Sequence, residues 1–429
     1  GADNSSTTFD GVIKGDGGFT KQGTGTLIFS GAAPNAYTGA TTVEAGTLNL
    51  SAGSGLADVS ALSVSSGATF DLDVSDVIGS ISGTGDIDLA SGLTLSAGAD
   101  NSSTTFDGVI SGDGGFTKQG TGALTFSGAA PNAYTGATSV EAGTLKFSGG
   151  SGLPDTSALS VSSGATFDLD VSDVIGSISG TGDIDLASGV TLSAGADNSS
   201  TTFDGVIRGD GGFIKQGTGT LSFSGVAPNA YTGATSVEAG TLNLSGGSGL
   251  ADASALSVSG GATFDLDVSN VIGSISGTGD IDLASGVTLS AGADNSSTTF
   301  DGVISGDGGF TKQGLGSLTF TGTNSYVGTT RIDSGSLIVG GSLSDQTSLF
   351  VSADGIYGVA ADDRVGTITG SGQIQLGAQT LTAGDSANAE FSGVIAGSTG
   401  GLTKVGSGEL TLSGNNTYEG TTSVQEGTL

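Results

Sequence analysis

The chain has 429 residues with 82 glycines and no cysteine, histidine, methionine or tryptophan, and 42 acidic against 10 basic side chains give a formal net charge of -32. This charge repels a phosphate backbone, which makes nucleic acid a poor partner. The missing cysteines exclude disulfides and thiolate metal sites, and without cysteine or histidine the usual pairs of catalytic nucleophile and base are lacking.

The sequence is an array of repeats. The segment GADNSSTTFDGVI, which begins at Gly1, recurs at Gly98, Gly195 and Gly292 and sets a period of 97 residues. We therefore divide one continuous solenoid into repeats at residues 1–97, 98–194 and 195–291, a divergent fourth repeat at 292–383 and a partial fifth at 384–429. Since both ends of the chain fall inside a repeat, we expect it to be part of a longer protein.

Each repeat contains short apolar pairs at regular intervals. In chain order the first ones are Leu27/Phe29, Leu48/Leu50, Phe70/Leu72 and Ile87/Leu89, then Phe106, then Leu124/Phe126. Apolar residues two positions apart predict strands that bury one face. The first members lie 21, 22, 17, 19 and 18 residues apart, so we expect five successive strand rungs in each repeat.

Segments of helical period are absent between these strands, which leaves meander hairpins, propeller blades and the coils of a parallel β-helix as architectures. Two-residue hairpin turns such as Asn-Gly are missing, and so is a blade signature of roughly 40 to 50 residues. We therefore predict an all-β fold, a right-handed single-stranded parallel β-helix with about five coils per repeat. At about 4.8 Å per strand each repeat would add roughly 24 Å, and the chain would form a rod.

One stretch of 32 residues, Gly17 to Leu48, organises the array and reads GGFTKQGTGTLIFSGAAPNAYTGATTVEAGTL. It returns at Gly114–Leu145, Gly211–Leu242 and Gly308–Leu337, and a shorter relative closes the chain at Gly400–Leu429. This stretch resembles the autotransporter-associated β-strand repeat of passenger domains in bacterial type V secretion systems. The residues that match in the first copy are Gly18, Lys21, Gly23, Gly25, Leu27, Gly31, Tyr37, Gly39, Val43, Gly46 and Leu48.

The resemblance implies a β-helical passenger at the surface of a Gram-negative bacterium, attached to the outer membrane or secreted. Such passengers are usually large and often adhesive, with roles in cell adhesion, biofilms and virulence. The implied partners are glycans or proteins of host or neighbouring cells, or other rods of the same kind. The family also implies a signal peptide and a membrane connection through a C-terminal β-barrel, and we expect both to lie outside this excerpt.

Other motifs indicate little chemistry. The sequence has no G-x-S-x-G elbow, and its glycine-rich loops at 15–18 and 23–25 lack the GK[ST] of a phosphate loop. Asn4, Asn101, Asn198 and Asn295 each begin Asn-Ser-Ser, which fits a glycosylation acceptor, although we expect an ordinary Asx turn there. We therefore predict no catalytic residue, no cofactor site and no enzyme.

Carboxylates alternate with apolar residues in ATFDLDV and GTGDIDLAS, so we expect them to point outward on neighbouring coils. Like charges about 5 to 7 Å apart are unfavourable unless water or a cation screens them. A surface Ca²⁺ site is therefore one hypothesis. Its candidate ligands are Asp71, Asp73, Asp86 and Asp88, then Asp168, Asp170, Asp183 and Asp185, then Asp265, Asp267, Asp280 and Asp282.

Two other interpretations of these acids stay open. They can form a solubilising face that discourages lateral aggregation, or the paired carboxylates of a glycosidase, although near-identical active sites every 97 residues would be odd. The fourth repeat keeps the apolar frame, but its four corresponding residues are Gly358, Ala360, Gln373 and Gln375. Carboxylates are thus dispensable for the fold.

Two classes of function follow: an extracellular adhesive or structural rod whose repeats give reach, and a carbohydrate-active β-helical enzyme or glycan-binding module. Differences between the first two repeats help to choose between them. They include Lys14/Ser111, Thr26/Ala123, Ile28/Thr125, Asn49/Lys146 and Ala57/Pro154. They are scattered over outward and loop positions and form no unique constellation, which favours the rod.

Overall fold

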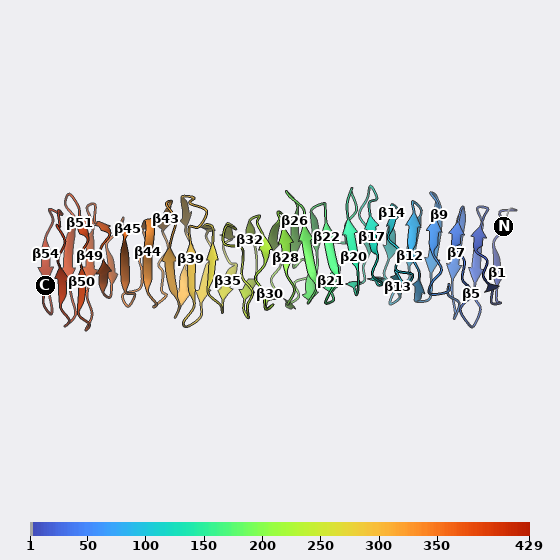
Figure 1. Cartoon of the computed structure of the whole chain (residues 1–429), viewed down its shortest axis with the longest axis horizontal. Helices are drawn as coiled ribbons and strands as arrows, with labels where there is room; N and C mark the ends of the chain where they lie inside the picture. Colours follow the sequence, from blue (N-terminus) through green and yellow to red (C-terminus); the bar gives the residue numbers. More distant parts are fainter. Residues whose placement is uncertain (1–2) are drawn as a thin grey trace. The chain divides into compact units, whose positions relative to one another are not determined.

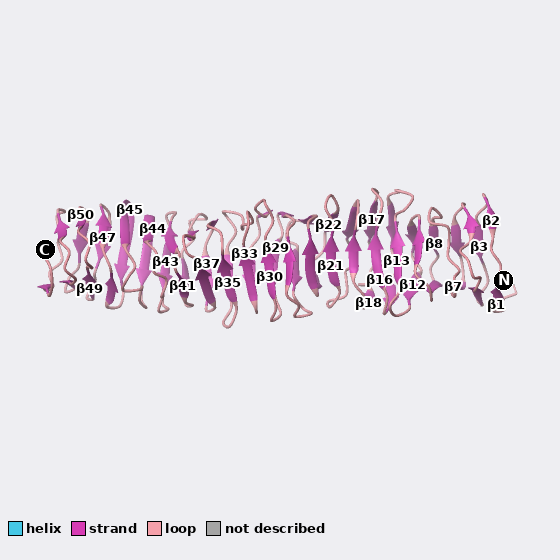
Figure 2. Ribbon diagram, turned by 90° about the horizontal axis from the view of Figure 1, so that it is seen from below, coloured by secondary structure: helices cyan, strands magenta, loops and turns pink. Residues whose placement is uncertain are grey.

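A computed structural model of the chain describes residues 3–429, and the described residues form short strands joined by turns, with no helix. Within each half of the chain, Figure 1 shows strands stacked side by side, and Figure 2 shows the loops that connect them. The chain divides into two compact halves, Gly1–Phe213 and Ile214–Leu429. The division falls within strand β29 (Gly212–Lys215).

In the N-terminal half the backbone winds repeatedly through three columns of parallel strands, numbered here in the order in which the chain visits them. A column is a position in this winding, and its strand pairing is interrupted between β18 and β23 in column 1 and between β5 and β10 in column 2. Column 1 contains β1 (Thr7–Phe9), β4 (Thr26–Phe29), β7 (Gly46–Leu50), β9 (Ala68–Leu72), β12 (Asp86–Leu89), β15 (Ile110–Gly112), β18 (Ala133–Tyr134), β23 (Asp173–Ile175) and β26 (Thr191–Ala194). Column 2 contains β2 (Lys14–Gly15), β5 (Ala36–Tyr37), β10 (Asp76–Ile78), β13 (Thr94–Ala97), β16 (Gly115–Lys118), β19 (Thr138–Val140), β21 (Ala158–Val161), β24 (Ser177–Gly180) and β27 (Thr201–Phe203). Column 3 contains β3 (Phe19–Lys21), β6 (Thr41–Val43), β8 (Leu62–Val64), β11 (Ile81–Gly83), β14 (Thr104–Phe106), β17 (Ala123–Phe126), β20 (Thr144–Phe147), β22 (Thr166–Leu169), β25 (Asp183–Leu186) and β28 (Ile207–Gly209).

The C-terminal half also winds through three columns, numbered 4 to 6 in the order of visits, and strand pairing is interrupted between β41 and β46 in column 4 and between β31 and β36 in column 5. Column 4 contains β30 (Thr220–Phe223), β33 (Thr241–Leu244), β35 (Thr263–Leu266), β38 (Asp280–Leu283), β41 (Ile304–Gly306), β46 (Asp363–Val365), β49 (Thr380–Ala383), β52 (Gly401–Lys404) and β54 (Thr422–Val424). Column 5 contains β31 (Ala230–Tyr231), β36 (Asn270–Ile272), β39 (Thr288–Ala291), β42 (Gly309–Lys312), β47 (Ile368–Gly370), β50 (Ala389–Phe391) and β53 (Leu410–Leu412). Column 6 contains β32 (Thr235–Val237), β34 (Leu256–Val258), β37 (Ile275–Gly277), β40 (Thr298–Phe300), β43 (Ser317–Phe320), β48 (Gln373–Gln375) and β51 (Val394–Ala396). The long strands β44 (Thr330–Val339) and β45 (Leu349–Val359) pair first in column 5 and then in column 6.

The strand register defines the length of a turn. Leu27 pairs with Leu48, which pairs with Phe70, then Ile87, then Ile110, so that a turn takes about 21 residues. These all-parallel pairings confirm the predicted parallel β-solenoid. Its right-handedness stays a prediction.

One expected rung is wrong. The apolar spacing predicted that the strand of Phe106 would follow that of Ile87, but Ile87 pairs with Ile110 in column 1, whereas Phe106 pairs with Gly83 in column 3. Strands of all three columns carry the same apolar alternation, so spacing alone does not reveal which strand lies above which. A repeat of 97 residues therefore takes between four and five turns and does not end on its starting column.

The inward residues of each column stack into a continuous apolar core, as period-2 alternation predicts. In column 3 the rings of Phe106, Phe126, Phe147 and Phe167 follow one another at centroid distances of 6.0, 5.1 and 5.6 Å, and all four are buried. Aromatic pairs at such distances stabilise a core beyond their buried area, by about 0.5–1.5 kcal/mol each. The fold is thus held by contacts between successive turns.

Tight turns between columns need glycine where the backbone of one coil touches the next. Gly83 has a φ of +108°, and a Cβ atom there would lie 2.0 Å from the carbonyl oxygen of Val64. Both the left-handed backbone and this contact exclude a side chain. The high glycine content thus reflects the close stacking of the turns.

Candidate functional site

The outward acids of the first repeat form a ladder along column 1. Asn49 of β7 pairs in register with Asp71 of β9, which pairs with Asp88 of β12, which pairs with Ser111 of β15. Asp73 follows β9, and Asp86 begins β12 beside Thr69. We call Asn49, Asp71, Asp73, Asp86, Asp88 and Ser111 the first ladder. The predicted outward direction is confirmed for its four acids, of which Asp71 is half-buried and the others are exposed.

Neutral amide and hydroxyl groups partly compensate the first ladder. The Nδ2 of Asn49 donates to Asp71 Oδ2 at 2.8 Å and to Asp73 Oδ2 at 2.9 Å, and Ser111 donates to Asp88 Oδ1 at 3.1 Å. Burial raises the pKa of Asp71, and the neighbouring carboxylates of Asp73 and Asp88 raise it further, while the bond from Asn49 opposes them. The ladder therefore keeps unfavourable negative charge that no cationic side chain balances.

The second repeat has a ladder of different charge, in column 3. Its members are Lys146, Asp168, Asp170, Asp183, Asp185 and Arg208, in the same register as the first. Lys146 Nζ lies 2.9 Å from Asp168 Oδ2 and 2.8 Å from Asp170 Oδ2, and Arg208 Nη1 lies 2.7 Å from Asp183 Oδ2. The hydrogen bond to Asp170 is the main cause that raises the pKa of Lys146. Two side chains thus supply cations that the first ladder lacks.

The C-terminal half contains one acidic ladder and one neutral counterpart. The third ladder, in column 4, consists of Asn243, Asp265, Asp267, Asp280, Asp282 and Ser305, and Asn243 Nδ2 donates to both Asp265 and Asp267 at 2.9 Å. Burial raises the pKa of Asp265, as it does for Asp71. In column 6 of the divergent repeat, the corresponding chain of partners is Ile338, Gly358, Gln375 and Ala396. The same scaffold thus carries three levels of charge.

Sequence reasoning found the carboxylates but missed what lies above and below them. In the sequence the Asn49/Lys146 difference is one of several scattered changes, yet each residue contacts two aspartates of its own ladder. The Lys14/Ser111 difference marks the equivalent outward position at the other end of the ladder, where the third copy has Arg208 and the fourth Ser305. The sequence did contain a signal for these contacts: the two outward positions lie one turn before and one turn after the acids, where a parallel solenoid brings side chains together.

No group of three or more acidic side chains positioned to hold a metal ion occurs among the described residues 3–429. The Ca²⁺ hypothesis stays a prediction. The different charges of the ladders make it more specific, because they predict which ladders should bind Ca²⁺ more weakly. A cation that screens the acids has less to gain where Lys146 and Arg208 already lie beside them.

We expect the full chain to bind Ca²⁺ weakly, and the double variant Asn49→Lys/Asn243→Lys to bind less, because it gives the first and third ladders the lysine of the second. Ile338→Lys serves as the control, since the neutral ladder has no acids to screen. Isothermal titration calorimetry at low salt measures all three. Equal heats from the parent and the double variant would leave only the solubilising role.

Buried lysines form a second charged feature that sequence reasoning did not assign. Lys118 points inward at the end of β16, and its Nζ donates to the carbonyl oxygens of Gln119, Gly120 and Ala142 at 2.7, 2.8 and 3.1 Å. Burial lowers the pKa of Lys118 to about 8, which the carboxylate of Asp100 partly opposes. Lys21, Lys215, Lys312 and Lys404 make the same kind of bonds in the other copies of the stretch. These lysines satisfy backbone carbonyls of two coils, which is a structural role.

A third set consists of carboxyl groups at the start of strands, half-buried at Asp173 and buried at Asp76. Asp173 Oδ2 accepts the Leu153 N–H at 2.9 Å, and Asp76 Oδ2 accepts the Leu56 N–H at the same distance. Burial raises the pKa of each carboxyl to about 7, against the opposing effect of the N–H donor. In the third repeat Asn270 takes this place, and its Oδ1 accepts the Leu250 N–H at 3.0 Å. A neutral amide thus suffices for the same link between coils.

The Asn-Ser-Ser segments correct one expectation. The Asx turn belongs to the preceding aspartate, because Ser102 N–H donates to Asp100 Oδ1 at 2.9 Å. Asn101 itself has a φ of +61°, and its Oδ1 accepts the Thr121 N–H of the next coil at 2.8 Å. Asparagine tolerates this left-handed backbone better than most residues do. The asparagine therefore links two coils.

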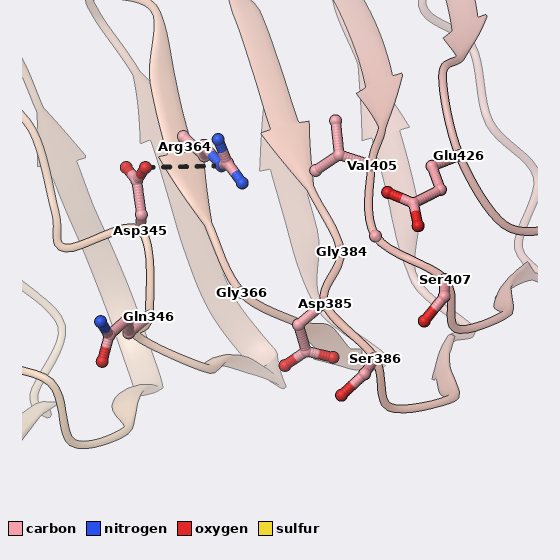
Figure 3. A pocket seen from close by; sticks show the side chains of 11 residues that line it. Asp345, Gln346, Arg364, Gly366, Gly384, Asp385, Ser386, Val405, Ser407 and Glu426 are labelled. Atoms are coloured by element: carbon pink, nitrogen blue, oxygen red, sulfur yellow. Dashed lines mark ion pairs between the residues drawn. The ribbon is translucent and has the colours of Figure 1, made fainter.

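A shallow pocket of about 600 Å³ lies in the C-terminal half, over loops of successive turns (Figure 3). Arg364 Nε pairs with Asp345 Oδ2 at 3.5 Å on one side, while Asp385 and Glu426 come from the loops of later turns. None of the residues that line it is aromatic, so it offers no stacking platform for a sugar ring. Its carboxylates belong to different loops, and nothing in their arrangement assigns one as an acid and another as a base.

In residues 3–429 we find no helix long and apolar enough to cross a membrane. The passenger-associated-transport-repeat family (PATR) matches residues 19–50, 116–147, 213–244, 310–339 and 402–429. These segments overlap the five copies of the organising stretch found in the sequence, and each begins two residues later than the copy.

Two related proteins extend the match beyond the repeats. The Adhesin BmaC autotransporter of Brucella suis biovar 1 (strain 1330) is 33% identical over 462 residues, which cover 96% of this chain and 13% of that protein. The Probable autotransporter YfaL of Escherichia coli (strain K12) is 30% identical over 406 residues, which cover 80% of this chain and 31% of that protein. The chain thus spans a minor part of either relative. No solved structure matches it.

Proposed function

Because the chain is an autotransporter passenger region with passenger-associated-transport-repeats, we propose that it acts outside the cell as an adhesive spacer. Each repeat adds length and presents its own copy of the outer surface. The observation that carries this proposal is the register: the first and second repeats make the same sequence of strand pairings, with Leu27–Leu48–Phe70–Ile87 matched by Leu124–Leu145–Phe167–Ile184.

An autotransporter passenger is exposed at the surface or secreted, and passengers related to adhesins are typically non-enzymatic. One relative is named an adhesin, which supports an adhesive role for this region. We propose as partners the glycans or proteins of host or neighbouring cells, or other copies of the chain. The net charge of -32 disfavours nucleic acid and makes side-by-side association dependent on salt or cations.

Removal of one whole repeat tests the spacer proposal. We expect a deletion of residues 98–194 to leave a folded passenger, because the new junction from Ala97 to Gly195 repeats the natural junction from Ala97 to Gly98. Adhesion of cells that display the shortened protein should fall only gradually, since multivalent attachment loses avidity with each removed copy.

The measurement is cell binding beside circular dichroism of the purified passenger. Complete loss of a specific activity by a folded deletion variant would overturn the spacer proposal. That outcome would favour a single site in the second repeat, as expected for an enzyme or a glycan-binding module.

A further inference from the structure

Successive repeats do not face the same way, which follows from the strand register within each half. Starting at Leu27 in column 1, four turns lead through Leu48, Phe70 and Ile87 to Ile110. The residue equivalent to Leu27 in the second repeat is Leu124, and it pairs with Thr104 in column 3. One repeat therefore takes four turns plus two of the three columns.

The C-terminal half shows the same offset independently. Four turns from Leu221 in column 4 lead through Leu242, Phe264 and Ile281 to Ile304. The equivalent residue of the next repeat, Leu318, pairs with Thr298 in column 6. The winding is cyclic: from column 6 the chain returns to column 4, as it returns from column 3 to column 1. Both halves therefore show the same offset.

The divergent repeat keeps this offset although it is shorter. Its residues 292–383 number five fewer than the 97 of the others. Four turns from Thr298 in column 6 lead through Leu318, Leu337 and Tyr357 to Ile374. The equivalent residue Ala389 lies in column 5, again two columns further on. The number of columns visited is unchanged, although the long strands β44 and β45 each pass through two of them.

From this offset we infer that the number of repeats controls direction as well as reach. Two columns forward out of three equals one column back, so the equivalent surface of each repeat lies one column back from that of the repeat before it. Within the N-terminal half, the first ladder lies on column 1 and the second on column 3. In a run of three such repeats, equivalent surfaces would lie on all three sides, and a partner could be met from any direction around the solenoid. This consequence for adhesion rests on the proposed function, whereas the offset itself does not.

The absence of natural cysteines makes disulfide trapping a clean test. In the full chain, Asp88→Cys/Ser111→Cys joins register partners of column 1, about 4.8 Å apart, within the range that a disulfide bridges. The control Asp88→Cys/Thr105→Cys places cysteines on β12 and β14, which would be neighbours in one column if a repeat took five whole turns. We expect near-complete cross-linking of the first pair under mild oxidation and none of the second, because Thr105 pairs with Thr125 in column 3.

The pair Asp88→Cys/Arg208→Cys tests the change of direction. In the full chain Arg208 lies beside Asp185 in column 3, so no cross-link forms. With residues 98–194 deleted, Arg208 takes the place of Ser111 and moves to column 1, where the cross-link should form. Trapping of Asp88 with Thr105 in the full chain, or no trapping with Arg208 in a deletion variant that is folded by circular dichroism, overturns the inference. Neither readout involves adhesion, so failure of the proposed function would be seen separately.

Discussion

Leu145→Asp should destabilise the solenoid by about 4–5 kcal/mol around the mutated turn, while distant turns stay protected. Leu145 of β20 is fully buried and lies between its register partners Leu124 and Phe167. The substitution removes a buried aliphatic side chain and leaves a carboxyl group without a partner in the core. Each turn contacts only its neighbours, so the damage should stay local.

Hydrogen exchange followed by mass spectrometry measures this effect peptide by peptide. Protection should fall most in β17, β20 and β22, and least in strands several turns away. Lys146→Asn is the matched control on the outward face of the same strand, where loss of partly exposed ion pairs should cost at most about 1 kcal/mol. A uniform loss of protection over residues 3–429 would contradict the solenoid's nearest-neighbour character.

Alternation and periodicity were enough to predict the coil architecture. Pairs such as Leu48/Leu50 and Phe70/Leu72 are buried and stacked as expected, because a parallel solenoid must present one apolar face from every strand. The offset between repeats was not predictable in this way. It depends on which of three similar strands lies above a given one, and loop lengths decide that, as the pairing of Ile87 with Ile110 shows.

The candidate site was predicted in part for a similar reason. Outward acids follow directly from alternation with inward Ile87 and Leu89, and the structure confirms their outward direction. Partners from the next turn are about 21 residues away in sequence, so the contacts of Lys146 with Asp168 and Asp170 required the register. Charged side chains inside the solenoid, such as Lys118, break the expected pattern, because backbone carbonyls of two coils solvate the ammonium group.

Asp173→Asn should remove, around the coils that Asp173 links, the local share of a loss of stability that the parent chain suffers between about pH 4 and pH 7. Burial raises the pKa of Asp173 from its ordinary 3.8 to about 7 in the folded protein. Between these values the folded state holds a proton that the unfolded state has released, so stability falls as pH rises through this window. Three pH units correspond to about 4 kcal/mol, an upper value for this one group.

The expected result is thus a variant that matches the parent near pH 4 and exceeds it at pH 8, because the amide still accepts the Leu153 N–H and cannot ionise. Asn270→Asp is the reciprocal control: it places a carboxyl beside Leu250 and should introduce the same pH dependence in the C-terminal half. Hydrogen exchange of β21 and β24, corrected for the intrinsic effect of pH on exchange, measures the local stability of Asp173→Asn and of the parent. If the parent and Asp173→Asn lose protection equally from pH 4 to pH 8, Asp173 is not the titrating group. Asn270 makes the same link between coils with an amide that does not ionise, so the third repeat keeps this link at every pH. The repeats should therefore differ in how much their stability falls as pH rises.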